Sequence, residues 1–171
     1  MIEVEVKVKV ADLGAALDRL SKLREVGRYE EEDIYWDDAL GTLRKRGVVL
    51  KLRRRDGACS LIFKGRRLKC HYKAREEVEV KVDDAKGMEK ILSEIGLKPS
   101  FKVFKVRREY ISPHGRVFLD EVRGAGSFME LEAVGRELSE ARARLRRLME
   151  EVGVRKEDII TKSYPEMLEK R

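Results

Sequence analysis

The residues best able to do chemistry in this sequence are acidic and basic side chains that alternate with apolar ones. Glu3, Glu5 and Lys7 are spaced two apart and separated by valines, and side chains at i and i+2 of a strand share one face. Carboxylates spaced in this way can bind a hard, oxygen-preferring cation such as Mg²⁺ or Mn²⁺. Lysine and arginine on such a face can hold phosphate oxygens, arginine through paired hydrogen bonds.

The same spacing recurs along the chain. Charged faces are also formed by Lys51, Arg53 and Arg55, by Arg75, Glu77 and Glu79, by Lys105 and Arg107, and by Glu130 and Glu132, while Lys64 and Asp120 stand alone on their strands. Turned inward in a closed sheet, these faces would line a cavity that is repulsive unless water, a metal ion and a polyanion occupy it. Turned outward, they would be surface ion pairs of a charge-rich protein. The pattern by itself leaves both arrangements open.

The elements that must position these side chains are mainly strands. Period-two alternation and β-branched residues predict strands at 2–10, 29–37, 48–55, 60–64, 73–82, 102–111, 117–122 and 128–135. Helices are predicted from Leu13 to Leu23, before Gly27, and at 85–95 and 139–152, with a short terminal helix that begins at Ser163 and Pro165. Many strands joined by short turns favour an antiparallel barrel with helices outside over a βαβ arrangement.

Length and composition predict one domain that covers residues 1–171, because no Pro/Gly/Ser-rich stretch divides the chain. No apolar run approaches the roughly 20 residues of a membrane helix, and no signal peptide is recognisable, so we expect a cytoplasmic protein. Cys59 and Cys70 have no metal-ligand spacing and are expected to be reduced thiols. Charged residues make up 42% of the chain, and it contains no Asn or Gln, which predicts a thermophilic source, such as a thermophilic archaeon.

A net charge of +7 would suit either a nucleic-acid binder or a pocket for a small polyanion. The chain has no GxxxxGK[ST] motif, so side chains, not backbone amides, would have to hold phosphate. The basic residues are interleaved with carboxylates that would repel a phosphate backbone in the absence of a metal ion. This favours a small triphosphate ligand over nucleic acid, although a non-catalytic binder of polyphosphate, nucleotides or RNA stays an alternative.

Many of these charged residues stand in motifs that follow one another almost from end to end. The motifs are Glu3-Val4-Glu5-Val6-Lys7, Asp33-Ile34-Tyr35-Trp36-Asp37, Leu50-Lys51-Leu52-Arg53, Phe63-Lys64-Gly65, Arg75-Glu76-Glu77-Val78-Glu79, Lys105-Val106-Arg107, Leu119-Asp120-Glu121-Val122, Gly126-Ser127-Phe128-Met129-Glu130-Leu131-Glu132 and Lys162-Ser163-Tyr164. In this order the chain resembles the CYTH superfamily of triphosphate tunnel metalloenzymes. That superfamily includes class IV adenylate cyclases, thiamine triphosphatases and inorganic triphosphatases.

The resemblance implies a closed, eight-stranded antiparallel tunnel with residues of three roles. The implied ligands of one or two Mg²⁺ or Mn²⁺ ions are Glu3, Glu5, Glu79, Asp120, Glu130 and Glu132. The implied triphosphate-binding residues are Lys7, Lys51, Arg53, Lys64, Arg75, Lys105 and Arg107, and the implied catalytic residues are Glu3, Glu5, Lys7, Arg53 and Lys64. Lys51 departs from the arginine usual at its position, and it keeps the charge without the forked geometry.

The resemblance also implies the reaction. Attack of water on the terminal phosphorus of inorganic triphosphate, thiamine triphosphate or a nucleotide would give hydrolysis. Attack of a ribose 3′-hydroxyl on the α-phosphorus of ATP would instead give cyclic AMP and pyrophosphate. The expected partner is a triphosphate-containing small molecule, with no membrane. Lys162 and Tyr164 stand either at a tunnel mouth or simply at a helix start, and the sequence leaves the oligomeric state open, a homodimer included.

Overall fold

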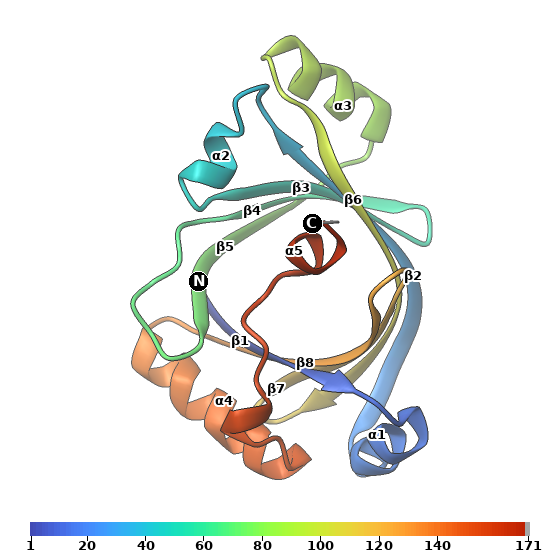
Figure 1. Ribbon diagram of the computed structural model, residues 1–171, viewed down its shortest axis with the longest axis vertical. Coiled ribbons are helices and arrows are strands. Elements are labelled where there is room, and N and C mark those ends of the chain that lie inside the picture. The colour runs from blue at the N-terminus through green and yellow to red at the C-terminus, as the bar shows by residue number, and fades with distance from the viewer. Residues whose placement is uncertain (170–171) are drawn as a thin grey trace.

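In the computed structural model, which describes residues 1–169, eight strands close into an antiparallel barrel (Figure 1). Around the barrel the order is β1-β5-β4-β3-β2-β6-β7-β8. The strands are β1 Ile2–Val10, β2 Arg24–Asp37, β3 Val49–Arg55, β4 Ala58–Lys64, β5 Lys73–Lys81, β6 Lys98–Ser112, β7 Gly115–Val122 and β8 Gly126–Gly135. This confirms the α+β, mainly β, closed eight-stranded barrel predicted from the sequence.

The first strand closes the barrel. β1 pairs with β8 along its whole length and with β5 through the register Ile2↔Glu76 to Glu5↔Lys73. The valines of β1 point outward, and Val4 and Val6 are almost completely buried against the outer helix layer. The acidic and basic residues of β1 therefore point into the barrel, as the period-two alternation requires.

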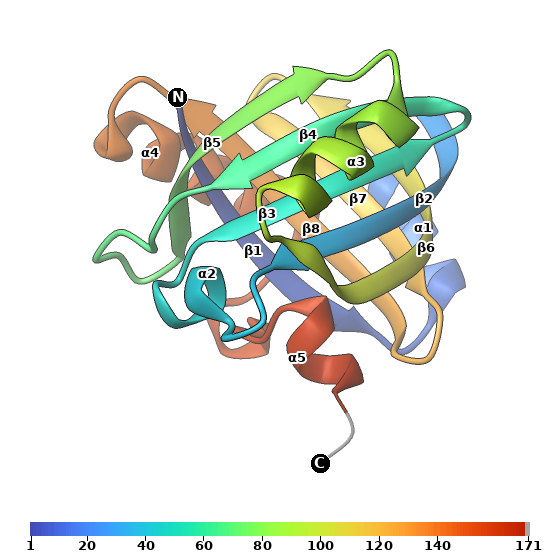
Figure 2. The ribbon, with the colours of Figure 1, turned by 90° about the horizontal axis from the view of Figure 1, so that it is seen from above.

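Three helices pack on the outside of the barrel. α4, Leu138–Val152, covers β1 and β8 and buries Leu145 and Leu148 completely. α1, Leu13–Leu20, is capped by Asp12 and buries Leu20 in the same core. α3, Ala85–Glu94, contributes Leu92 to a smaller core beside β2 and β3 (Figure 2). No helix within residues 1–169 is both long and apolar enough to span a membrane.

The terminal helix departs from the expectation that all helices lie outside. α5, Tyr164–Leu168, lies across one mouth of the barrel in Figure 1 and inserts the ring of Tyr164 among inward-facing side chains. It follows the one-turn 3₁₀ helix η1, Lys156–Asp158, and begins with a capping box between Ser163 and Glu166. The physical reason is the charged interior, which offers Tyr164 hydrogen-bonding and cation–π partners that an outer face would lack.

One local prediction is wrong, and one short helix was not predicted. Gly27 does not end the first helix; it lies within β2, which begins at Arg24, and a register shift between Glu25 and Gly27 marks an irregularity in the pairing with β6. A Cβ at this glycine would collide with the ring of Tyr29, so the strand needs glycine there. The sequence analysis also missed α2, Thr42–Lys45, whose first backbone N–H groups are bound by the side chains of Asp37 and Asp38.

Candidate active site

The inward faces of the strands line a cavity of about 1250 Å³. Its charged lining is largely shielded from solvent: Lys7 is 3% exposed, Arg107 2% and Asp33 1%. The alternative in which these charges form surface ion pairs is therefore wrong. Buried charges are tolerated only when they are paired, and most of this lining is paired across neighbouring strands.

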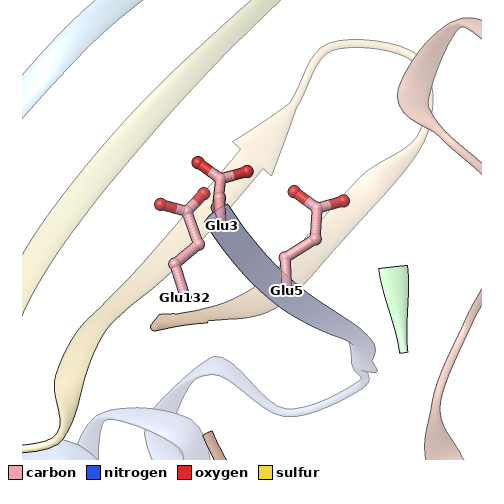
Figure 3. Close-up of side chains that lie close together, drawn as sticks. All are labelled: Glu3, Glu5 and Glu132. Carbon is pink, nitrogen blue, oxygen red and sulfur yellow. The ribbon is translucent and has the colours of Figure 1, made fainter. Parts of the chain in front are cut away.

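One part of the lining is acidic. Glu3 and Glu5 of β1 and Glu132 of β8 converge, and each offers a carboxylate oxygen that lies within 4.8 Å of the others (Figure 3). The register places Glu5 directly opposite Glu132. Burial, followed by the charge of Glu132, raises the pKa of Glu3 well above its usual value, and burial raises the pKa of Glu132 to about 7. The protein thus holds carboxylates where their charges repel one another.

Lys64 of β4 is the main protein cation beside this acidic group. Its Nζ lies 2.8 Å from Glu3 Oε1 and 2.6 Å from Glu77 Oε2. Burial by itself would raise the pKa of Glu77, but the charge of Lys64 lowers it to about 2. Burial would likewise raise the pKa of Glu5, but the positive charge of Lys64 outweighs the effect of burial, so the pKa of Glu5 is lowered. Lys64 therefore neutralises part of the acidic group.

The donor chemistry of Glu3, Glu5 and Glu132 fits a divalent cation. Close, buried carboxylate oxygens repel one another strongly unless a cation lies between them, and Mg²⁺ and Mn²⁺ favour carboxylate oxygens. Across residues 1–169 this is the only such group of three or more His, Cys, Asp or Glu side chains. Glu79, Asp120 and Glu130, the other expected metal ligands, do not join it.

The opposite part of the lining is basic and is organised by Asp33 of β2. Arg53 donates from Nε to Asp33 Oδ1 at 2.8 Å and from Nη2 to Oδ2 at 3.0 Å, and Lys51 Nζ lies 2.8 Å from Oδ2. Burial would raise the pKa of Asp33, but Lys51 and Arg53 hold it well below its usual value. For Lys51, burial and the neighbouring Arg53 lower the pKa to about 8.

Asp120 of β7 organises a second basic pair in the same way. Arg107 donates to both of its oxygens, at 2.7 and 2.6 Å, and also contacts Glu130, while Lys105 Nζ lies 3.4 Å from Oδ2. Within the described residues neither Arg53 nor Arg107 uses Nη1 in a hydrogen bond to the protein. Each guanidinium is thus held by an aspartate and keeps donors for an anion in the cavity.

Two other expected residues have different surroundings. Arg75 donates from Nη1 to the carbonyls of Gly47 and Gly65, at 2.8 Å each, and so ties two loops at the rim. Lys7 pairs with Glu130 at 3.1 Å, directly across β1 and β8. Glu79 also lines the cavity, but its side chain is exposed. The remaining expected basic residues, Lys51, Arg53, Lys64, Lys105 and Arg107, lie well inside.

Sequence reasoning missed two charged residues of the barrel interior, Glu31 and Lys73. Glu31 is 2% exposed and lies within 3.3 Å of Lys105 and 3.5 Å of Arg53. Lys73 Nζ lies 3.4 Å from Glu5 Oε1. Each stands two residues from a residue singled out in the sequence, Asp33 and Arg75, so the same alternation could have found both. The tunnel-mouth position of Tyr164 was one of two alternatives in the sequence, but alternation gives no signal for the contacts of its ring with interior side chains.

Tyr164 belongs to the site through two contacts. Its hydroxyl donates to Asp120 Oδ2 at 2.8 Å, and Lys7 Nζ lies 3.6 Å from the centre of its ring. Just before it, the carbonyl of Lys162 accepts from Lys7 and Lys73. Of the two roles considered for Lys162 and Tyr164, the structure supports the tunnel mouth, and the Lys162 carbonyl also faces the cavity lysines.

Comparisons with known proteins agree with this architecture. Residues 1–164 match the family model described as "CYTH domain". The chain is 33% identical over 98% of both chains to a Methanocaldococcus jannaschii protein named "Putative adenylate cyclase MJ0240". A solved Vibrio parahaemolyticus structure, named as a "putative adenylate cyclase", has a TM-score of 0.86 and 23% identity over 98% of both chains. A Hippeastrum protein described as having "a dominant triphophatase activity" has a TM-score of 0.63 and 20% identity, covering 90% of this chain and 88% of that one.

Proposed function

Because the chain belongs to the CYTH domain family, we propose that this enzyme is a divalent-metal-dependent triphosphatase that holds the triphosphate group of its substrate inside the barrel. One observation carries the proposal. A group of three partly buried carboxylates, Glu3, Glu5 and Glu132, shares one cavity with arginines that are oriented by aspartates and keep unused donors. Such a cavity complements a metal–polyphosphate complex, which carries both signs of charge.

In this proposal the basic part of the cavity binds the phosphate oxygens. Arg53 and Arg107 present Nη1 toward the anion, while Asp33 and Asp120 fix the plane of each guanidinium. Lys51 and Lys105 lie beside them and add point charges that can follow the phosphate chain. Because these groups are positioned before the substrate arrives, little reorganisation is needed when charge develops on the phosphate oxygens.

We propose Glu3, Glu5 and Glu132 as the residues that hold Mg²⁺ or Mn²⁺. When bound, the ion would neutralise phosphate charge and polarise the phosphoryl group. Lys64 would then share these carboxylates with the ion, and its ammonium group can turn toward a phosphate oxygen. Lys7, held by Glu130 and by the ring of Tyr164, would supply a further cation at the mouth that α5 covers.

A second candidate is class IV adenylate cyclase activity. It is favoured by the name of the Methanocaldococcus relative, which is similar over almost the whole of both chains. The same cavity would hold the triphosphate of ATP, and the attacking group would be the ribose 3′-hydroxyl in place of water. The Hippeastrum neighbour is named a "putative adenylyl cyclase" and is yet described by its triphosphatase activity, so both activities are named for one protein of similar fold.

The test is a product assay. Purified protein is incubated with Mg²⁺ or Mn²⁺ and, separately, inorganic triphosphate, thiamine triphosphate and ATP, and orthophosphate, pyrophosphate and cyclic AMP are quantified. Orthophosphate release that EDTA abolishes supports the triphosphatase, whereas cyclic AMP with pyrophosphate supports the cyclase. Glu3→Gln should abolish turnover, and the matched control Glu76→Gln, on the exposed outer side of β5, should not. No turnover of any substrate would refute both activities.

A further inference from the structure

The C-terminal half of β5 has a neighbouring strand on only one side. β1 pairs with β5 from Lys73 to Glu76, and the N–H of Glu77 then reaches the carbonyl of Met1 at 3.4 Å. On the other side β4 accompanies β5 as far as Lys81. In the part of the chain that the structure describes, no strand pairs with Val78–Lys81 on the β1 side. Figure 2 shows β5 running on past the N-terminus toward α3.

The unpaired backbone groups belong to Glu79 and Lys81. The Glu76 carbonyl accepts from Gly65 N–H and the Val82 N–H donates to the Cys59 carbonyl, so even-numbered residues direct their backbone groups toward β4. Successive residues of a strand direct these groups to opposite sides. The N–H and C=O of Glu79 and Lys81 therefore point away from β4, along an open strand edge.

The outer face of this segment is apolar and uncovered. Val78 is 49% exposed and Val80 56%, and Phe63 on the adjacent β4 is 39% exposed. α3 packs beside β2 and β3, and α4 packs on β1 and β8. An open edge with exposed β-branched residues is a template for pairing with another strand.

We propose that this edge pairs antiparallel with β5 of a second copy of the chain, in the register that places Val80 opposite Val80. In that register Glu79 lies opposite Lys81 of the second copy, and Lys81 lies opposite Glu79 of the second copy. Each Glu79–Lys81 pair exchanges its free N–H and C=O groups. The two Val80 side chains meet in a non-hydrogen-bonded pair, where opposing side chains lie closest.

The charges of Glu79 and Lys81 favour this register, and they favour a second copy of the chain as the partner. Centring the pairing on Glu79 would oppose that glutamate to itself, and centring it on Val78 would oppose Glu77 to Glu79. Of these three registers, the one centred on Val80 opposes unlike charges at the free positions Glu79 and Lys81, so this part of the edge is complementary to itself. The competing view is that Glu79 and Lys81 are charges that protect a lone edge from pairing. The two views predict opposite responses to changes in these charges.

The experiment measures oligomeric state by sedimentation equilibrium over a range of protein concentrations, with circular dichroism as the check on folding. The wild type should sediment at twice the chain mass of 19.8 kDa. Lys81→Glu replaces attraction by repulsion and should raise the dimer dissociation constant by at least about tenfold. The matched control Lys86→Glu, an exposed change of the same charge on α3, should leave it unchanged.

Two further variants test the edge and its register. Lys81→Pro removes an N–H that faces the open side and spares the pairing with β4, so it should give a folded monomer. The double variant Glu79→Lys/Lys81→Glu should restore the dimer, because the swapped charges oppose one another again only in the register centred on Val80. A wild type that is monomeric throughout, a dimer that survives Lys81→Pro, or a double variant that stays monomeric would each overturn the proposal. Oligomeric state is read without substrate, so these outcomes do not depend on the proposed activity.

Discussion

Asp33 and Arg53 form a bidentate pair across β2 and β3, with Nε–Oδ1 and Nη2–Oδ2 distances of 2.8 and 3.0 Å. They are direct partners in the strand register, so the pairing of the strands alone brings them together. Arg107 and Asp120 repeat the arrangement across β6 and β7. In each pair the aspartate carboxylate orients an arginine. Asp120 therefore contacts cations and the Tyr164 hydroxyl, and it does not join the group of Glu3, Glu5 and Glu132.

Asp33→Asn should weaken substrate binding and destabilise the fold. The amide leaves Lys51 and Arg53 without their counter-ion in a buried position, a change that costs about 3–5 kcal/mol when one partner of a buried pair is removed. We expect KM for triphosphate to rise about tenfold or more and the unfolding temperature to fall. Triphosphate at a given concentration should then stabilise the variant less than the wild type, because stabilisation by a ligand falls as its dissociation constant rises.

Steady-state kinetics and thermal unfolding with and without triphosphate measure both effects. Asp83→Asn, at an exposed position after β5, is the matched control. Kinetics equal to those of the wild type would remove Asp33 from its positioning role.

Glu132→Gln should separate stability from metal binding. Without metal, the substitution removes one member of a repulsive, partly buried group, so the unfolding temperature should stay equal or rise. With Mn²⁺ at about 100 times its dissociation constant, the wild type gains about 2.7 kcal/mol, which for a chain of this size is about 5–10 °C. The variant should lose most of that gain. Melting curves across a Mn²⁺ titration measure it, with Glu76→Gln as control, and an undiminished shift in Glu132→Gln would place the metal elsewhere.

The sequence predicts the barrel and much of its lining, because strict alternation determines which side chains share a face. The charges on β1, β3, β6 and β8 point inward as expected. Alternation does not determine the strand register. The pairing of Glu31 with Lys105 and of Asp33 with Arg53 could therefore not be assigned from the sequence. Alternation also does not describe contacts between distant parts of the chain. Gly27 lies inside β2 and does not end the preceding helix, and α5 enters the mouth because the interior offers Tyr164 its partners.

Lys51→Arg should change the pH dependence of both stability and binding. The pKa of Lys51 is lowered to about 8, first by burial and then by Arg53, while its unfolded value is about 10.4. Between these values the unfolded chain binds more protons than the folded one, so Lys51 makes stability rise as pH rises through this window. Arginine stays charged, and the variant should lack this contribution.

A bound triphosphate favours the charged form of Lys51, so binding at pH 9 should take up protons in the wild type and fewer in Lys51→Arg. Calorimetric titration in buffers of different ionisation enthalpy measures that uptake. If both proteins show the same buffer dependence, Lys51 does not contact the anion.

Tyr164→Phe should isolate the hydroxyl of the residue that closes the mouth. The hydroxyl donates to Asp120, a charged acceptor with no exposed surface, and such a hydrogen bond contributes about 1.5–3 kcal/mol. The phenyl ring keeps its place beneath Lys7, so the loss should appear as a lower urea midpoint with an unchanged slope. Tyr164→Ala removes the cation–π contact as well and should lower the midpoint further. If Tyr164→Phe were as stable as the wild type while Tyr164→Ala were not, the ring alone would hold α5 in the mouth, and the contact with Asp120 would contribute nothing to that closure.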